Sequence, residues 1–295
     1  MKKIVSIALF GDVDRKDGSG QNYHAYLSTF MLAHHNLFSC EDGWELHVHV
    51  DDLTFNGSRG PMLSRLQSMG LINLTLMSDA ILTRAMLWRM APIYRDDTDY
   101  VFCRDIDSLP MPRDRRVCDE FIVSKCVVHT VHDSQSHAGI MGGLCGFQST
   151  AFKNTTGIHS LQALYDYARV SNDEWALHGT DQNVLNRLID QPSGLTLLEH
   201  RYNGWHAGPG KYPIRGKGSY RCKSWSCPTP DKGTWKGEWA QKDWLLDGKV
   251  GTFREHADLL ANHLGSAGYD IEKARMFWNQ YGDQKVARIV ADCEK

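Results

Sequence analysis

Two aspartates, Asp105 and Asp107, stand two positions apart directly after a short apolar segment, residues 100–103. The apolar run predicts a short buried strand, and side chains two positions apart in an extended chain point in the same direction. Two carboxylates that face one point repel each other, and a divalent cation is the usual relief. The pattern therefore predicts a metal site that serves a phosphate-bearing ligand. The alternative is a polar turn that closes a strand, because an Asp-x-Asp pattern is short and common.

A second acidic pair, Asp51 and Asp52, follows another predicted strand, residues 44–50, in which apolar and polar residues alternate. This pair is a rival metal site. For Asp51 we favour a different role, either beside a bound nucleotide or as the cap of the next turn.

Two arginines, Arg84 and Arg89, lie on a predicted helix, residues 79–93, just before the acidic strand. Their functional role would be to pair with phosphate or with the acidic cluster. The alternative is that both arginines only solvate an exposed helix face.

The segment at residues 139–146 carries four glycines in eight positions and follows a polar loop. Such a density of glycine predicts a close backbone approach, either to a ligand or to another strand. The segment lacks the Gly-Lys-Ser/Thr ending of a phosphate-binding P-loop and the spacing of a dinucleotide-binding turn. Further along, Asp181 precedes a predicted helix at residues 184–189, where it is either a helix cap or a functional carboxylate.

The remaining elements are read from hydrophobic periodicity. Strands are expected at residues 4–10, 71–77 and 127–131, and helices at residues 22–38, 61–69, 159–170 and 269–291, with one more helix that ends at residue 124. The nearly continuous apolar run at residues 4–10 is typical of a strand in a sheet that is buried on both faces.

The bulk properties are those of a globular chain, with 295 residues, 42% hydrophobic residues and a net charge of −2. The apolar stretch near the N-terminus is too short, and too soon interrupted by Gly11, for a signal peptide. No segment is long and apolar enough to cross a bilayer. The eight cysteines form no C-x-x-C pair, which favours a reduced, cytoplasmic setting, the host cytoplasm if the protein is viral.

The composition changes at residues 201–249, which hold ten Lys or Arg against four Asp or Glu, and five of the nine tryptophans. The resulting charge of +6 leaves −8 for the rest of the chain, and the poor periodicity predicts an irregular excursion. Basic residues interleaved with aromatic ones suit a polyanion, or bases and sugars stacked on rings. The alternative is a long loop stapled by tryptophans, whose charge only balances an acidic body.

In their order along the chain, these motifs resemble nucleotide-sugar-dependent glycosyltransferases of the GT-A fold, of the bacterial and viral type with an Arg-Asp-x-Asp-Ser strand. The matching segments are residues 9–12, 87–89, 103–108, 140–146, 180–182 and 263–265. They cover most of residues 1–200 and one late motif. At residues 263–268 the chain departs from one retaining family, because it lacks that family's Lys-Pro-Trp ending.

The resemblance implies an α/β fold with a mixed, mostly parallel central sheet flanked by helices. It implies a nucleotide-sugar-binding core at residues 1–200, an acceptor-side excursion at residues 201–249, and a C-terminal segment at residues 250–295 that returns to the core. The expected activity is transfer of a hexosyl or pentosyl group from a nucleotide-diphosphate sugar, with a UDP-sugar as the first choice. The cofactor would be Mn²⁺ or Mg²⁺.

The resemblance also implies roles for particular residues. The metal ligands would be Asp105, Asp107 and the late His263, and the pair near the anomeric carbon would be Asp181 and Gln182. The residues that bind the nucleotide sugar would be Phe10, Gly11, Asp12, Asp51, Arg84, Arg89, Arg104, Asp105, Gly142 and Gly143. The acceptor side would include Trp205, His206, Lys211, Arg215, Lys217, Arg221, Lys223 and Trp225.

The acceptor stays open between a glycan and a hydroxymethylated pyrimidine in DNA, as in phage-type DNA modification. Retention or inversion at the sugar carbon stays open too. Two other classes of protein compete with this interpretation. A haloacid-dehalogenase-like phosphatase also uses Asp-x-Asp, but Asp105 lies deep in the chain and no Gly-Thr follows Asp107. A non-catalytic nucleic-acid-binding protein built on residues 201–249 would leave the acidic strand and the glycines unexplained.

Overall fold

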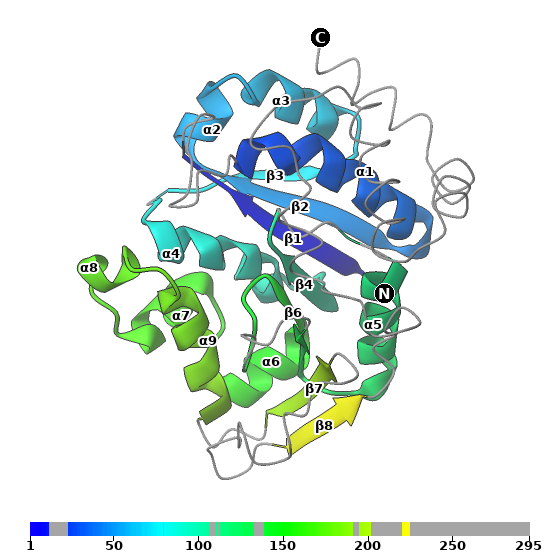
Figure 1. The fold of residues 1–295 in the computed structure, drawn as a ribbon, viewed down its shortest axis with the longest axis vertical. Coiled ribbons are helices and arrows are strands. Elements are labelled where there is room, and N and C mark those ends of the chain that lie inside the picture. Colours follow the sequence, from blue (N-terminus) through cyan, green and yellow to red (C-terminus); the bar gives the residue numbers. More distant parts are fainter. Residues whose placement is uncertain are drawn as a thin grey trace.

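The computed structural model describes residues 1–11, 23–78, 80–106, 110, 112–132, 139–190, 195–201 and 220–224. These residues form one central sheet with helices packed on both of its faces (Figure 1). The predicted α/β architecture, a mostly parallel sheet flanked by helices, is confirmed.

The sheet has eight strands within the described residues, in the order β3-β2-β1-β4-β6-β5-β7-β8. The strands are β1 (Lys3–Leu9), β2 (Trp44–Val50), β3 (Asn73–Leu76), β4 (Tyr100–Arg104), β5 (Val128–His132), β6 (Leu144–Gln148), β7 (Thr196–Arg201) and β8 (Tyr220–Ser224). Strand β6 runs antiparallel to its neighbours β4 and β5, and every other pairing is parallel.

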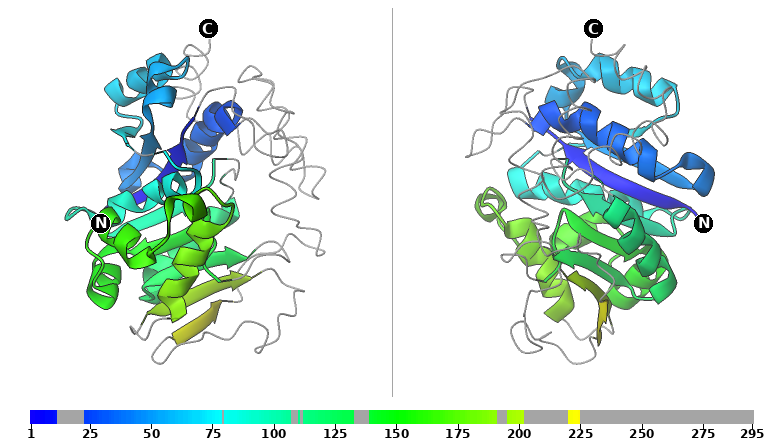
Figure 2. Two further views of the ribbon diagram at one scale, coloured as in Figure 1. Left: turned by 90° about the vertical axis from the view of Figure 1, so that its left-hand side faces the viewer. Right: turned by 45° about the vertical axis from the view of Figure 1, so that its right-hand side comes forward.

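The helical elements are η1 (Tyr23–Tyr26), α1 (Leu27–Leu37), η2 (Cys40–Asp42), α2 (Asp52–Asn56), α3 (Gly60–Ser68), α4 (Leu82–Met86), η3 (Leu87–Tyr94), α5 (Pro112–Ser124), α6 (Ser149–Thr156), α7 (Leu161–Ala168), α8 (Asn172–Trp175) and α9 (Thr180–Asp190). Side chains of α1, α3 and α5 pack on one face of the sheet, and those of η3, α6, α7 and α9 pack on the other. The blue helices α1 to α3 and the green helices α6 to α9 lie toward opposite ends of the molecule (Figure 2).

Successive side chains of β4 point to opposite faces of the sheet. Phe102 packs with the α1, α3 and α5 side, whereas Val101 and Cys103 pack with the η3, α6 and α7 side. All three side chains are fully buried, as the apolar run predicted. Cys103 and Cys145 are free, buried thiols that pack in the core as small hydrophobic side chains.

Several predicted elements differ from the structure for identifiable reasons. The predicted helix 79–93 is divided into α4 and the 3₁₀ helix η3, which contains Pro92, a residue without a backbone N–H. Strand β6 was not predicted, because its first residues belong to the glycine-rich run. Strand β7 was not predicted either. Residues 220–224, placed in an irregular excursion by the sequence, instead form edge strand β8. Their alternating sequence Tyr-Arg-Cys-Lys-Ser was the available signal.

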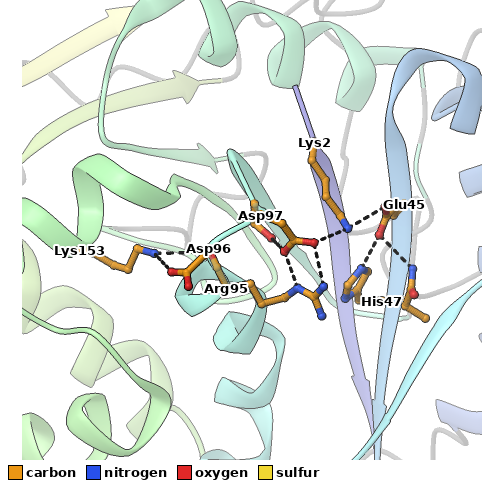
Figure 3. A network of polar contacts seen from close by, with 9 residues as sticks. Lys2, Glu45, His47, Arg95, Asp96, Asp97 and Lys153 are labelled. Atoms are coloured by element: carbon orange, nitrogen blue, oxygen red, sulfur yellow. Dashed lines mark hydrogen bonds and ion pairs between the residues drawn. The ribbon is translucent and has the colours of Figure 1, made fainter.

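An ion-pair network lies at the amino ends of β1, β2 and β4 (Figure 3). Lys2 Nζ is 3.0 Å from both Glu45 Oε1 and Asp97 Oδ2, and Arg95 Nε is 2.9 Å from Asp97 Oδ1. Lys2 and Glu45 are partly buried and Arg95 and Asp97 are about half exposed, and the network links the amino ends of the three strands. The acidic motif lies at the opposite end of the strands, where the carboxyl ends of the parallel strands meet. Open α/β sheets bind their ligands at this end.

Within the described residues, no helix has the length and apolar character needed to span a membrane.

Candidate functional site

A buried arginine joins two carboxylates at the carboxyl edge of the sheet. Arg89 Nη1 donates a hydrogen bond to Asp105 Oδ1, and Arg89 Nη2 lies 3.4 Å from Asp181 Oδ2. The Arg89 side chain is 4% exposed, that of Asp181 12% and that of Asp105 38%. Asp105 is therefore the one member of this cluster with substantial access to solvent.

Helix η3 brings Arg89 to this position because most of the helix is buried against the sheet. Leu87, Met90 and Ile93 pack into the core with β4. The thiol of Cys103 donates to the carbonyl of Arg89 over 3.5 Å, which ties η3 directly to β4. Asp181 reaches the same point from the first turn of α9. The predicted pairing of Arg89 with the acidic cluster is thus present in the structure.

Two glycines make room for the cluster. Gly143 lies opposite Asp105, whose amide donates to the Gly143 carbonyl over 3.2 Å, and a Cβ at Gly143 would overlap the Asp105 carboxylate. A Cβ at Gly142 would lie 3.1 Å from both Arg89 Nη2 and Asp181 Oδ2. The glycine-rich run thus allows a close approach, but at Gly142 and Gly143 the partners are charged side chains of the protein, not the ligand or strand that was predicted.

The charges of the cluster shift two pKa values. Burial alone would lower the pKa of Arg89, but the carboxylates of Asp105 and Asp181 outweigh it, and the net pKa is above the ordinary value. Burial raises the pKa of Asp181 above its ordinary value of 3.8; the Arg89 cation opposes this rise and the Asp105 charge adds to it. Asp181 thus holds a proton more tightly in the folded chain than in the unfolded one.

This shift predicts a pH dependence of stability. Because the folded pKa of Asp181 is the higher one, its contribution to folding is complete below about pH 4 and is lost as pH rises through the folded pKa. The free energy of unfolding of the wild type should therefore fall relative to Asp181→Asn as pH rises from 4, and the difference should then level off. Urea unfolding at several pH values measures the difference, and a slope of the opposite sign would contradict it.

A cleft whose empty space of about 420 Å³ includes open solvent at its mouth has Asp105 in its lining. Its walls come from the end of β1, from η1, from α4 and from the end of β4. The lining residues are Ala8, Leu9, Phe10, Tyr23, His24, Met86, Asp105 and Ile106. The lining is mainly apolar and aromatic and includes one carboxylate, the kind of surface that small-ligand sites present. Phe10 is held by an edge-to-face contact with Trp88, with ring centroids 5.6 Å apart.

Asp51 fixes the backbone where β1 leaves the sheet. Its Oδ2 accepts from the amide of Gly11 and its Oδ1 from the amide of Thr54, both at 2.9 Å, so it caps α2. The Thr54 hydroxyl donates to the Gly11 carbonyl over 3.1 Å. Gly11 has φ +88° and is held at both its amide and its carbonyl. The helix-cap role proposed for Asp51 is confirmed.

Replacing Asp51 should cost stability. Asp51→Ala removes a helix cap and leaves the Gly11 amide without its carboxylate, so we expect the free energy of unfolding to fall by about 1–2 kcal/mol. Asp52→Ala, on the exposed neighbour in the first helical turn, should change it by less than about 0.5 kcal/mol. Equal losses in the two variants, measured by urea unfolding, would contradict the assignment of the cap to Asp51.

Other predicted site residues lie elsewhere. Arg104 is 2% exposed and its guanidinium donates to the carbonyls of Cys103 and Cys145, so direct binding of a nucleotide sugar does not fit its position. Arg84 stacks on the ring of Tyr165, with 4.4 Å from its guanidinium carbon to the ring centroid. Gln182 Nε2 lies 3.5 Å from Met141 Sδ, beside the glycine-rich run.

Some predictions fall outside the described residues. These are the metal ligands Asp107 and His263, the nucleotide-loop residue Asp12, and the acceptor-side residues Trp205, His206, Lys211, Arg215, Lys217 and Trp225. Arg221 and Lys223 belong to β8. Within the part of the chain that the structure describes, no group of three His, Cys, Asp or Glu side chains could hold a metal ion.

Four residues of the cleft wall carry no signal in the motifs above: Tyr23, His24, Met86 and Ile106. Tyr23 and Met86 fall within the predicted helices 22–38 and 79–93, where an apolar side chain is expected to face the core and not a ligand site. The available signal was position, because η1 is the first described element after β1 and Ile106 lies between the two motif aspartates.

No protein-family model matches the chain, and no curated protein matches it by sequence. Solved structures similar to it include TarS residues 1–349 from S. aureus, with 9% identity over 95% of this chain and 70% of that one, at a TM-score of 0.44. A TarS complex with UDP gives 9% identity, the same coverages and a TM-score of 0.43. The mannosyltransferase PcManGT from Pyrobaculum calidifontis, in complex with GDP-Man and Mn²⁺, gives 12% identity over 99% and 73%, at 0.41. All three TM-scores lie below 0.5.

Proposed function

We propose that the chain is a metal-dependent glycosyltransferase that moves a sugar from a nucleotide-diphosphate sugar to an acceptor hydroxyl. One observation carries the proposal: a buried arginine holds two carboxylates, Asp105 and Asp181, at the carboxyl edge of a mostly parallel sheet, beside an apolar cleft. An apolar and aromatic cleft beside one carboxylate, with a second carboxylate of raised pKa joined to the first through Arg89, suits a reaction that needs a metal-bound anion and a proton acceptor.

The cleft is our proposed site for the nucleoside of the donor. Phe10 and Tyr23 supply aromatic surface, and Asp105 stands at the cleft's edge where a diphosphate would follow the nucleoside. Gly142 and Gly143 would serve the donor indirectly, because the space beside them is taken by the side chains of Asp105, Arg89 and Asp181. A UDP-sugar remains our first choice of donor.

The residues at this edge partly fit a divalent cation. Asp105 offers a carboxylate that faces the cleft, and oxygen ligands with one imidazole suit Mn²⁺ or Mg²⁺. Asp107 and His263 are the further ligands we propose. When bound, the ion would stabilise the charge that develops on the leaving diphosphate. Arg89 would keep the Asp105 carboxylate oriented by its hydrogen bond to Oδ1.

Asp181 is our candidate for the general base in an inverting reaction. Its raised pKa makes it a better proton acceptor than an ordinary carboxylate once it is ionised, and Arg89 stabilises that ionised form. Gln182, the next residue, would hydrogen-bond the sugar or the acceptor. In a retaining reaction the leaving phosphate would itself take the proton, and Asp181 would then orient the sugar.

For the acceptor we propose a glycan or a hydroxymethylated pyrimidine in DNA, bound by residues 201–249 with their charge of +6. A pyrimidine would have to be flipped out of the duplex or offered in a single strand. Retention on DNA at low salt, lost when Lys211, Arg215, Lys217, Arg221 and Lys223 are neutralised, would favour DNA. No retention at low salt would exclude DNA and leave the glycan.

The experiment that tests the proposed function is a donor screen. The protein is incubated with a panel of nucleotide sugars and Mn²⁺, and released nucleoside diphosphate is measured with and without EDTA. We expect release from one donor class, abolished by EDTA. No release from any donor, or formation of an aspartyl-phosphate that beryllofluoride mimics, would contradict the proposal, and the second result would favour a phosphatase.

A further inference from the structure

The backbone at residues 139–143, here called the glycine segment, determines where the Asp105 carboxylate can lie. The amide of Asp105 donates to the carbonyl of Gly143 over 3.2 Å, which extends the β4–β6 ladder by one residue. The Asp105 carboxylate occupies the space that a side chain at residue 143 would fill, and Gly142 leaves similar room for Arg89 and Asp181. Any movement of the glycine segment therefore changes the geometry of all three charged groups.

Side chains from two other elements hold this segment. The amide of Met141 donates to Thr130 Oγ1 over 3.0 Å, and Thr130 is a fully buried residue of β5. The amide of Ile140 donates to Asn186 Oδ1 over 2.7 Å, and Asn186 belongs to α9, the helix that carries Asp181. Two consecutive amides of the segment are thus each bound by a side-chain oxygen.

A third contact holds the first residue of the segment. His132 Nε2 lies 2.7 Å from the carbonyl of Gly139, and because a carbonyl oxygen only accepts, this nitrogen carries the proton. Gly139 has φ +67°, and a Cβ at this residue would overlap the amide group of Asn186. The side chain of Asn186 therefore fits against bare backbone and leaves the segment little freedom to shift.

We propose that Thr130 and Asn186 are positioning residues, which act on the reaction through the glycine segment and fix the relative places of Asp105, Arg89 and Asp181. The proposal rests on the proposed function for its reaction, but the holding of the segment is a property of the fold. Gly142 already lies close to Arg89 and Asp181. A misplacement of about 1 Å at reacting groups costs up to about a hundredfold in rate, so these two distant side chains should matter for turnover.

The test uses two matched pairs of variants in the full chain. Thr130→Val has nearly the same shape and removes the acceptor for the Met141 amide, whereas Thr130→Ser keeps it. Asn186→Leu removes the acceptor for the Ile140 amide, whereas Asn186→Asp keeps an oxygen there. Each variant is examined by hydrogen–deuterium exchange of the peptide that contains residues 139–143, and by steady-state turnover of the donor found in the screen.

We expect Thr130→Val and Asn186→Leu to exchange roughly two- to tenfold faster at residues 140 and 141, the factor that one net hydrogen bond is worth. Their kcat should fall about tenfold to a hundredfold with a much smaller change in KM for the donor. Thr130→Ser and Asn186→Asp should be close to the wild type in both measurements. Rescue by the variants that keep the acceptor separates a positioning role from a loss of folding.

Three results would overturn the proposal. The first is wild-type exchange at residues 140 and 141 in both Thr130→Val and Asn186→Leu. The second is a wild-type kcat in both variants, and the third is an equal loss of kcat in the two variants that keep the acceptor. If the wild type turns over no donor at all, the proposed function fails instead, and the exchange measurement still decides whether Thr130 and Asn186 hold the segment.

Discussion

Arg89→Met should lower both stability and turnover more than any other single change on the predicted helix 79–93. The variant removes the cation that faces Asp105 and Asp181 and leaves the nearly buried Asp181 carboxylate uncompensated. Removal of one partner of a buried ion pair costs about 3–5 kcal/mol, and we expect the lower end because Asp105 reaches solvent. Turnover should fall at least about a hundredfold because the two carboxylates lose their common partner. Urea unfolding and donor turnover are the measurements.

Arg95→Met is the matched control for this prediction. Arg95 also pairs with an aspartate, Asp97, but both side chains are about half exposed, at 50% and 52%. An exposed pair contributes about 0–1 kcal/mol, so Arg95→Met should have nearly wild-type stability and turnover. If Arg89→Met were as stable and as active as Arg95→Met, the buried pairing would not organise the site.

Gly143→Ala should abolish most of the turnover by steric displacement alone. The new Cβ would overlap the carboxylate of Asp105, which would have to leave its place beside Arg89. Overpacking of this kind costs about 1–3 kcal/mol of stability, and the displaced carboxylate should reduce turnover at least about a hundredfold. Turnover and unfolding of the same preparation measure both effects.

Gly146→Ala separates the two effects of the extra methyl group. A Cβ there would lie 2.7 Å from atoms of the His129 ring and 2.8 Å from Phe102, inside the core and away from the carboxylate. We expect a similar loss of stability with a much smaller loss of turnover. If both glycine variants lost turnover in the same proportion, instability would explain the result and the Gly143 contact would have no special role.

Hydrophobic periodicity was sufficient to predict the elements with uniform patterns. The alternating segment of β2 was placed at its observed residues, Trp44–Val50, and the apolar runs of β1 and β4 were found within one or two residues. Strand β6 could not be found in this way, because its Gly146 makes room for the rings of His129 and Phe102 on the neighbouring strands. The glycines just before the strand make room for the charged side chains of the site. Such contacts between distant residues leave no periodic pattern in the sequence.

The residues of the candidate site could be predicted from the sequence, but the contacts between them could not. Asp105, Asp181 and Arg89 were each singled out by residue type, yet each had an alternative role as a turn, a cap or a surface charge. Only the fold brings them together, since 16 residues separate Arg89 from Asp105 and 92 separate it from Asp181. Arg104 was predicted to be part of the site because it stands next to Asp105 in the motif, but the fold takes it away from the site. Side chains alternate along a strand, so Arg104 points into the core.

The most direct test of the central claim is nucleoside diphosphate release by wild type and Asp105→Asn in the presence of Mn²⁺. The asparagine oxygen can still accept from Arg89, so the variant removes charge with little change in shape. A bound divalent ion contributes several kcal/mol to such a reaction, so we predict that Asp105→Asn releases nucleoside diphosphate at least about a hundredfold more slowly. The control is Asp119→Asn, which alters a surface pair with Arg115 and should release it at the wild-type rate. Undiminished, Mn²⁺-dependent release by Asp105→Asn would contradict the proposal that Asp105 helps to hold the metal and the donor.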